Sequence, residues 1–234
     1  MDRHVDRHQV LPPIVTAALP TALPVLPALR PLLPGNGLRR GGVVSVSGGP
    51  GATSLLLALL AGTSAVGGWC AVVNLPTLGP AAAAELGVDL ERLVVVPSPG
   101  RRWAGVVAGL LDGFDVVAVR PPGRVGPGDA RRLLGRARER GATLLTVGDW
   151  SGAGLRLSVS APRWQGVGGE GRGRLRARCL TVRTQGRGAA AQPRLARLWL
   201  PAPGGGCTAA PAAPAAPFTE SGGRAATTAA GTGS

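Results

Sequence analysis

The sequence predicts an α/β fold with a mostly parallel central sheet and antiparallel strands toward its carboxyl end. Between residues 43 and 147, short continuous apolar runs alternate with segments of helical character. Glycine or proline ends most of these segments, which is typical of the turns between strands and helices. After Gly148 the strand-like segments follow one another without intervening helices. The first pattern indicates a parallel sheet covered on both faces, and the second an antiparallel extension of it.

The elements follow in order along this part of the chain. Five short apolar runs are expected to form the parallel strands: 43–47, 69–74, 93–96, 115–119 and 143–147. Four segments are expected to be helical: 55–66, 80–86, 101–111 and 128–140. In the last of them, small and apolar residues recur at helical spacing and should face the sheet. Three later segments are expected to be antiparallel strands: 155–160, 175–184 and 194–200.

Composition divides the chain into four regions. Residues 1–10 are polar and expected to be disordered. Residues 11–40 are apolar but interrupted by prolines, each of which costs a helix about 3 kcal/mol, so a membrane-spanning helix is excluded. Their leucines recur every three or four residues, which favours short, packed helical turns, with a partner-binding arm as the alternative. Residues 41–200 hold the α/β domain, and residues 201–234 are expected to be a disordered Ala/Gly/Pro tail.

The ionisable residues exclude several kinds of chemistry. All 26 basic residues are arginine, and the chain has no lysine and no tyrosine. A Schiff-base lysine and a lysine-bearing phosphate loop are therefore absent. The two histidines, His4 and His8, lie in the polar N-terminus, so a Ser-His-Asp triad in the domain is not expected. The three cysteines are isolated, which argues against a metal cluster and favours a reducing, cytoplasmic environment.

The net charge of +14 is concentrated in one part of the sequence. Residues 101–200 hold 19 of the 26 arginines but only 6 of the 12 acidic residues. A basic surface of this kind attracts phosphates or acidic protein surfaces.

A glycine-rich turn lies between the first expected strand and the first helix. It comprises Gly48, Gly49 and Gly51, followed by Thr53 and Ser54. Nucleotide-binding proteins place phosphates at such a turn, where free backbone N–H groups hold the anion. The turn is short and lacks the lysine of the GxxxxGK[ST] pattern, so a tight turn with no ligand is an equally good interpretation.

Several motifs carry a family resemblance over residues 20–200. They are "LRRGGVVSVSG", "GVDLERLVVVPSPG", "FDVVAVRPPGRV", "ARRLLGRARERGATLL", "APRWQGVGGEGRGRLRARCLTV" and "RLARLWLPAPG". Together they resemble the actinobacterial ImuA-prime proteins, and the segment 69–100 is similar to the RecA core after its phosphate loop. The resemblance implies a RecA-like three-layer core. It also implies an accessory factor of a DNA-damage-induced mutagenic polymerase complex, with an ImuB-like Y-family adaptor and an error-prone C-family polymerase as partners.

The RecA catalytic positions do not carry over to this chain. The position of the phosphate-binding lysine holds Thr53. Pro76 lies where the chain should supply the catalytic glutamate after the second strand, and Arg120 replaces the magnesium-associated aspartate. Phosphoryl transfer needs a cation and a carboxylate, so we expect a degenerate site, no hydrolysis and no cofactor. Weak binding of a nucleotide without hydrolysis is the alternative.

The second candidate site is a row of arginines. Arg172, Arg174, Arg176 and Arg178 alternate with smaller residues, and alternate residues of a strand share one face. Arg183 lies just beyond, and Trp164 begins an expected flexible loop before the row. Guanidinium groups suit phosphates, so the row is a candidate for binding DNA. An acidic protein surface or a solvated face are the alternatives. The arginines of segment 128–140 are better interpreted as a solvated helix face.

These observations favour a non-catalytic RecA-like adaptor of DNA-damage tolerance. It would act by protein contacts and, secondarily, through DNA, with no membrane partner. The alternatives are a P-loop-type ATPase with an atypical site and a SulA-like inhibitor of cell division.

Overall fold

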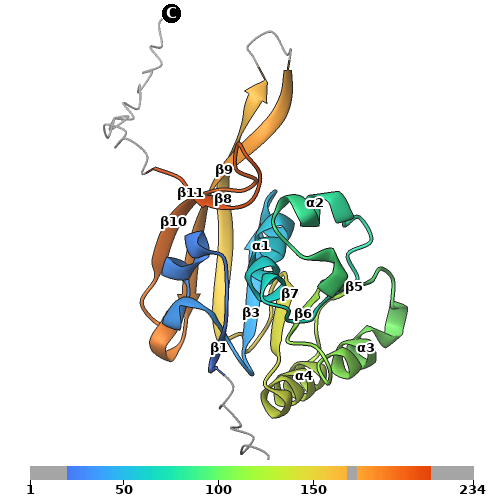
Figure 1. Ribbon diagram of the computed structural model, residues 1–234. Coiled ribbons are helices and arrows are strands. Elements are labelled where there is room, and N and C mark those ends of the chain that lie inside the picture. The colour runs from blue at the N-terminus through green and yellow to red at the C-terminus, as the bar shows by residue number, and fades with distance from the viewer. Residues whose placement is uncertain (1–19, 168–172, 212–234) are drawn as a thin grey trace, which may run out of the picture.

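The computed structural model describes residues 20–167 and 173–211. Its centre is a nine-stranded sheet in the order β11-β10-β9-β8-β3-β7-β6-β4-β5 (Figure 1). The strands of this sheet are β3 (Val43–Gly48), β4 (Cys70–Val73), β5 (Leu93–Val96), β6 (Val116–Val119), β7 (Thr143–Val147), β8 (Leu155–Val167), β9 (Gly173–Gly186), β10 (Arg194–Trp199) and β11 (Thr208–Ala209). The predicted α/β fold class is confirmed.

The pairing in the sheet changes from parallel to antiparallel at β8. Strand β8 runs parallel to β3 on one side and antiparallel to β9 on the other. The strands from β3 to β5 are all parallel, and β9, β10 and β11 are antiparallel. The inner parallel strands β4 and β6 are buried along their whole length because helices cover both faces, whereas the edge strand β5 is partly exposed.

Two pairs of helices cover the parallel half. Helices α1 (Ala52–Ala65) and α2 (Pro80–Glu85) pack on one face, and α3 (Trp103–Leu110) and α4 (Pro127–Arg140) pack on the other. Two short 3-10 turns precede β5 and α3: η3 (Leu90–Arg92) and η4 (Gly100–Arg102). A third, η5 (Gly188–Ala190), joins β9 to β10. Helix α1 begins three residues earlier than expected, directly after the glycine-rich turn.

The proline-interrupted segment packs against the domain. It consists of β1 (Ala22–Leu23), η1 (Pro27–Leu32), η2 (Pro34–Asn36) and β2 (Leu38–Arg39). Leu29 and Leu33 are fully buried in the core formed with α1 and β10. The expected helical turns are thus 3-10 turns, and the pairing of β1 with β2 was not expected. Residues 11–19 and the polar residues 1–10 lie outside the described residues.

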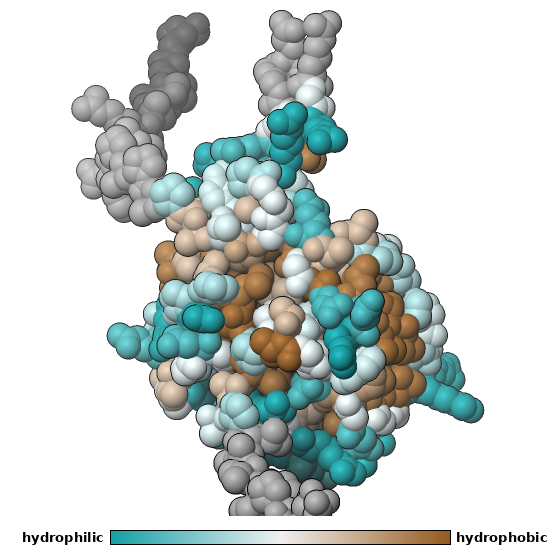
Figure 2. All heavy atoms as spheres, in the orientation of Figure 1, coloured by the Kyte–Doolittle hydropathy of each residue, from teal (hydrophilic) through white to brown (hydrophobic). Residues whose placement is uncertain are grey.

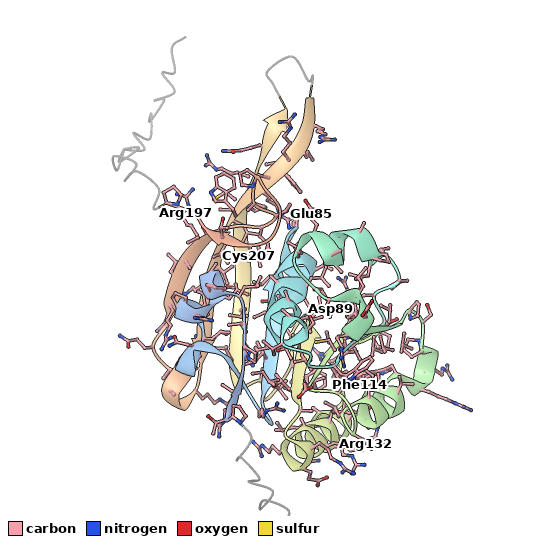
Figure 3. The ribbon with its side chains drawn as sticks, in the orientation of Figure 1. Glu85, Asp89, Phe114, Arg132, Arg197 and Cys207 are labelled. Atoms are coloured by element: carbon pink, nitrogen blue, oxygen red, sulfur yellow. The ribbon has the colours of Figure 1, made fainter. Side chains whose placement is uncertain are left out.

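The expectation of a disordered tail from residue 201 is wrong for residues 201–211. Strand β11 pairs with β10, and the Gly206 N–H donates to the Glu85 carbonyl over 2.7 Å. Glu85 and Cys207 are both labelled in Figure 3, where this segment passes close to α2. The segment is ordered because the edge of β10 and the end of α2 satisfy its backbone hydrogen bonds, which composition does not reveal. The rest of the expected tail, 212–234, lies outside the described residues.

No helix in the described ranges combines the length and the apolar character needed to cross a bilayer.

Replacing Gly62 by alanine should detach the N-terminal segment from α1. A Cβ on Gly62 would overlap the backbone of Val25, whereas a Cβ on Gly135, in the interior of α4, would meet nothing within 4 Å. We expect Gly62→Ala to lower the free energy of unfolding by about 1–3 kcal/mol. Gly135→Ala should raise it by about 0.5–1 kcal/mol, because alanine is the better helix former. Urea denaturation checks both, and equal effects would contradict the packing of the segment on α1.

Candidate functional site

The glycine-rich turn after β3 is pressed against β8 and β9. Gly48 and Gly51 have φ angles of 109° and 119°, which side chains rarely adopt. A Cβ on Gly48 would overlap the Val159 carbonyl oxygen, and one on Gly51 would lie 2.8 Å from Leu180. Gly49 has open space around it. The turn is therefore built from glycine where it touches the sheet and is open where it faces away.

Two arginines bind the hydroxyl groups that follow this turn. Arg178 from β9 donates to the Ser54 Oγ over 2.6 Å, and Arg120 from the end of β6 donates to the Thr53 Oγ1 over 3.2 Å. In a working phosphate loop the lysine occupies the position of Thr53, and the next hydroxyl binds magnesium. Here both hydroxyls accept hydrogen bonds from cations. Both hydroxyl groups are therefore engaged within the described chain.

The carboxyl ends of neighbouring strands meet at this turn. Asn74, with a φ of 57°, follows β4 and donates from its side-chain amide to the Arg120 carbonyl over 2.7 Å. Pro76 is exposed in the loop beyond and brings no carboxylate. Asp149 follows β7 and is exposed, but the Thr53 and Ser54 hydroxyls are bonded to arginines rather than to it. Within the described ranges no group of three or more His, Cys, Asp or Glu could hold a metal ion.

Arg178 lies in the interior, which corrects its predicted place in an exposed row. It is only 6% exposed, and its Nε donates to the Leu200 carbonyl over 2.9 Å. Its guanidinium also lies 4.9 Å from the ring centroid of Trp164, its cross-strand neighbour. Burial lowers the pKa of Arg178 below its usual range, yet a guanidinium keeps its charge in proteins. The sequence suggested a free phosphate ligand, but the tertiary structure uses this cation to join β9 to the turn.

Two further arginines of the row, Arg174 and Arg176, lie on a hairpin. Strands β8 and β9 extend beyond the body of the molecule (Figure 1), and Arg174 and Arg176 are exposed there. Figure 2 shows hydrophilic residues gathered near the described end of this hairpin. Residues 164–167 belong to β8 instead of the expected loop, and Leu175 is 53% exposed instead of facing the core. Arg172, Gly168 and Gly169 lie outside the described residues.

Arg183 does not continue this row. Its neighbours Val182 and Thr184 are buried, whereas Arg183 is exposed. Because side chains alternate along a strand, Arg183 points to the opposite face of the sheet from Arg178. The predicted set of arginines is thus divided between a hairpin, a buried contact and a second face.

The arginines of α4 form the solvated face that was expected. Arg136 contacts Asp112 over 2.6 Å and Glu139 over 3.5 Å, and Arg140 also contacts Asp112, over 3.2 Å. The hydrogen bond from Arg136 lowers the pKa of Asp112. Such exposed ion pairs contribute little to stability.

Two tryptophans and two cysteines that lie away from the arginines are explained by packing and burial. Trp150 is 1% exposed and packs in the core. Trp69 is 40% exposed and lies edge-on to Phe114 at the start of β4. Burial raises the pKa of the Cys70 and Cys207 thiols to about 12. Both are therefore neutral and poor nucleophiles at physiological pH.

Arg178→Ala should destabilise the protein, whereas Arg174→Ala should not. We expect Arg178→Ala to lower the free energy of unfolding by about 2–4 kcal/mol, because it removes two charge-assisted hydrogen bonds and a cation–π contact. Arg174→Ala, on the exposed part of the same strand, should change it by less than about 0.5 kcal/mol. Chemical denaturation of the two variants provides the comparison. An Arg178→Ala variant as stable as the parent would disprove the joining role of this side chain.

The chain was compared with solved structures, with known proteins and with family models. The chain resembles the solved structure of the RadB recombinase with a TM-score of 0.59 at 15% sequence identity, over 79% of this chain and 97% of that one. At this identity the likeness shows the fold, which is RecA-like.

The chain is also 42% identical over 145 residues to the uncharacterized protein Rv3395c of Mycobacterium tuberculosis, covering 58% of this chain and 71% of that protein. The family model described as the MT3502 N-terminal domain matches residues 31–152, more than half of the chain. That range holds the glycine-rich turn and Arg120 but ends before β8. The chain therefore belongs to the family of the MT3502 N-terminal domain.

Proposed function

We propose that this protein is a non-catalytic RecA-like accessory protein of the ImuA-prime type. It would act in a DNA-damage-induced translesion synthesis complex in the cytoplasm. The observation that carries the non-catalytic part is the pair of arginines on Thr53 and Ser54, which occupy the hydroxyl groups a nucleotide site would need.

Electrostatics make hydrolysis at this edge unfavourable. Magnesium needs oxygen ligands and is normally held by a carboxylate and a hydroxyl beside the phosphates. Arg120 stands at the carboxylate position, and Arg178 donates to the hydroxyl. Two guanidinium groups repel a divalent cation. Neither of them can act as a base toward water, because guanidinium groups stay protonated.

With catalysis lost, binding is the remaining use of the fold. A RecA-like fold without its reaction chemistry can still present loops and strand edges to partners. The partners we propose are an ImuB-like Y-family adaptor and an error-prone C-family polymerase, with DNA as a further ligand. Arg174 and Arg176 on the projecting hairpin support a contact with an anionic partner.

A second candidate function rests on the same edge. The open backbone around Gly49 and the two nearby guanidinium groups would suit a phosphate that is bound but not hydrolysed. Nucleotide would then be a structural ligand and not a substrate. Separate measurements of ATP turnover and of ATP binding distinguish this candidate from a protein that binds no nucleotide.

Purified protein should show no ATP hydrolysis above the buffer rate. Phosphate release with Mg²⁺ and ATP measures turnover, and equilibrium dialysis with labelled ATP measures binding. The Ser54→Ala variant is the control and should behave like the parent in the turnover assay. Turnover in the parent that Ser54→Ala abolishes would reject the non-catalytic proposal, whereas binding without turnover would establish the second candidate.

The adaptor role is tested by capture from damage-induced cells. Tagged protein should retain the ImuB-like adaptor and the C-family polymerase at both low and high salt, and nuclease treatment should not release them. Capture that depends on intact DNA would indicate an indirect association. Absence of the adaptor would refute the proposal, and capture of the tubulin-like division protein instead would favour a SulA-like role.

A further inference from the structure

One face of the antiparallel half of the sheet has no helix over it in the described ranges. On the α1 side, Leu157, Val182 and Leu198 are buried in the core. The alternating residues Ser158, Arg183 and Leu195 point the other way and are exposed. Helices α3 and α4 cover that second face only over the parallel strands, where their core cluster lies. Strands β8, β9 and β10 therefore present an open sheet face.

The charge of this face has one sign. The sequences of β8, β9 and β10 contain arginines but no aspartate or glutamate. The helix α4 is different, because its Arg132, Arg136 and Arg140 are paired with carboxylates. Three arginines lie on the open face: Arg156 and Arg183 are exposed and Arg197 is half-buried, and the hydrogen-bond partners of their side chains in the described chain are neutral. Arg156 donates to the Trp150 carbonyl, and Arg197 donates to the Pro211 carbonyl and to the Cys179 sulfur.

The register places three arginines from three strands on one diagonal. Arg183 lies opposite Ser158 of β8 and opposite Leu195 of β10. Arg156 is two residues from Ser158, and Arg197 is two residues from Leu195 in the opposite direction along the sheet. Diagonal neighbours in a sheet are about 7–8 Å apart. That separation is comparable to the distance between successive phosphates of an extended nucleic-acid strand. Figure 3 labels Arg197, on the opposite side of the view from Arg132 of α4.

Polar donors flank the diagonal. Ser158 and Thr181 adjoin it on one side, and Gln185 adjoins it on the other. Hydroxyl and amide side chains of this kind commonly contact phosphate and sugar oxygens. Trp199, which is partly exposed on the same face, supplies an aromatic surface on which a base can stack.

We propose that this arginine diagonal, Arg156, Arg183 and Arg197, binds the phosphate backbone of single-stranded nucleic acid. An open sheet face lets bases splay and stack, whereas duplex grooves admit helices or narrow ribbons. An acidic protein partner is less well matched, because protein interfaces depend on a central cluster of buried anchors. Here Arg183 lies at the centre of the face between Ser158 and the exposed Leu195, so the face offers one apolar side chain and not a cluster of anchors.

The inference deepens the DNA contact of the proposed function and rests on it only in taking DNA as the polyanion. It concerns a different surface from the hairpin residues Arg174 and Arg176. The open face would bind nucleic acid even if the adaptor were not a partner. Adaptor capture and DNA binding are therefore measured on the same variants.

The test is fluorescence anisotropy of the full-length protein with a labelled thymidine oligonucleotide over a range of salt concentrations. The diagonal variant is Arg156→Gln, Arg183→Gln and Arg197→Gln. Its matched control, with the same loss of charge, is Arg131→Gln, Arg132→Gln and Arg138→Gln on α4. We expect the diagonal variant to bind about tenfold or more weakly, and its salt dependence to fall by about 2 in slope, as for three lost phosphate contacts. The control should bind within about twofold of the parent, because its arginines lie elsewhere.

A further variant guards against misfolding. Arg183→Gln alone removes no hydrogen bond that the Arg183 side chain makes within the described chain, and it should still weaken binding several-fold. Equal losses in the diagonal and control variants would show a general charge effect and overturn the proposal. So would a parent protein that does not bind the oligonucleotide. Unchanged DNA binding with lost adaptor capture would assign the face to an acidic protein surface instead.

Discussion

The close approach of the glycine-rich turn to β8 and β9 constrains both the architecture and the chemistry of this protein. Gly48 and Gly51 have no space for a side chain on the sheet side, so the turn, the start of α1 and the first antiparallel strands form one packed unit. Arg178 of β9 joins the parts of this unit. Its side chain donates hydrogen bonds to the Ser54 hydroxyl in α1 and to the Leu200 carbonyl just after β10. The junction between the parallel and antiparallel halves therefore lies where a related nucleotide-binding protein would keep its phosphates.

This junction shows how the glycine-rich turn of a RecA-like fold can be held together by contacts within the chain. In a working site the turn is organised around an anion and a metal ion, which together balance the charge of the lysine and the carboxylates. Here arginine hydrogen bonds organise the first turn of α1 from within the chain. A buried cation is costly unless it is paired or hydrogen-bonded, and Arg178 meets this condition through a hydroxyl, a carbonyl and the face of Trp164. The interactions that hold the turn together thus involve the same hydroxyl groups that a phosphate site would use.

The arginines show which features of a charged surface can be predicted from the sequence and which depend on the fold. Their concentration in residues 101–200 is visible in the sequence, and so is the alternation from Arg172 to Arg178. Alternation alone treats Arg178 like Arg174, because both have the same parity on one strand. Only the body of the domain distinguishes them, since β9 enters the core before Arg178 and leaves Arg174 on the projecting hairpin. The diagonal of Arg156, Arg183 and Arg197 has no sequence signal, because its members are far apart in the chain and are aligned by strand register.

Local patterns in the sequence were enough to predict the α/β class, the order of the parallel strands and helices along the chain, and the absence of the lysine and the acidic positions at the turn. These features depend on local patterns: apolar runs, helical spacing and the identity of single residues. The burial of individual arginines, the position of residues 201–211 and the open sheet face became visible only in the folded chain. Those outcomes depend on pairing between distant strands and on the space left beside each side chain. For residues 201–211, backbone groups of β10 and α2 supplied the hydrogen bonds that a composition of alanine, glycine and proline did not predict.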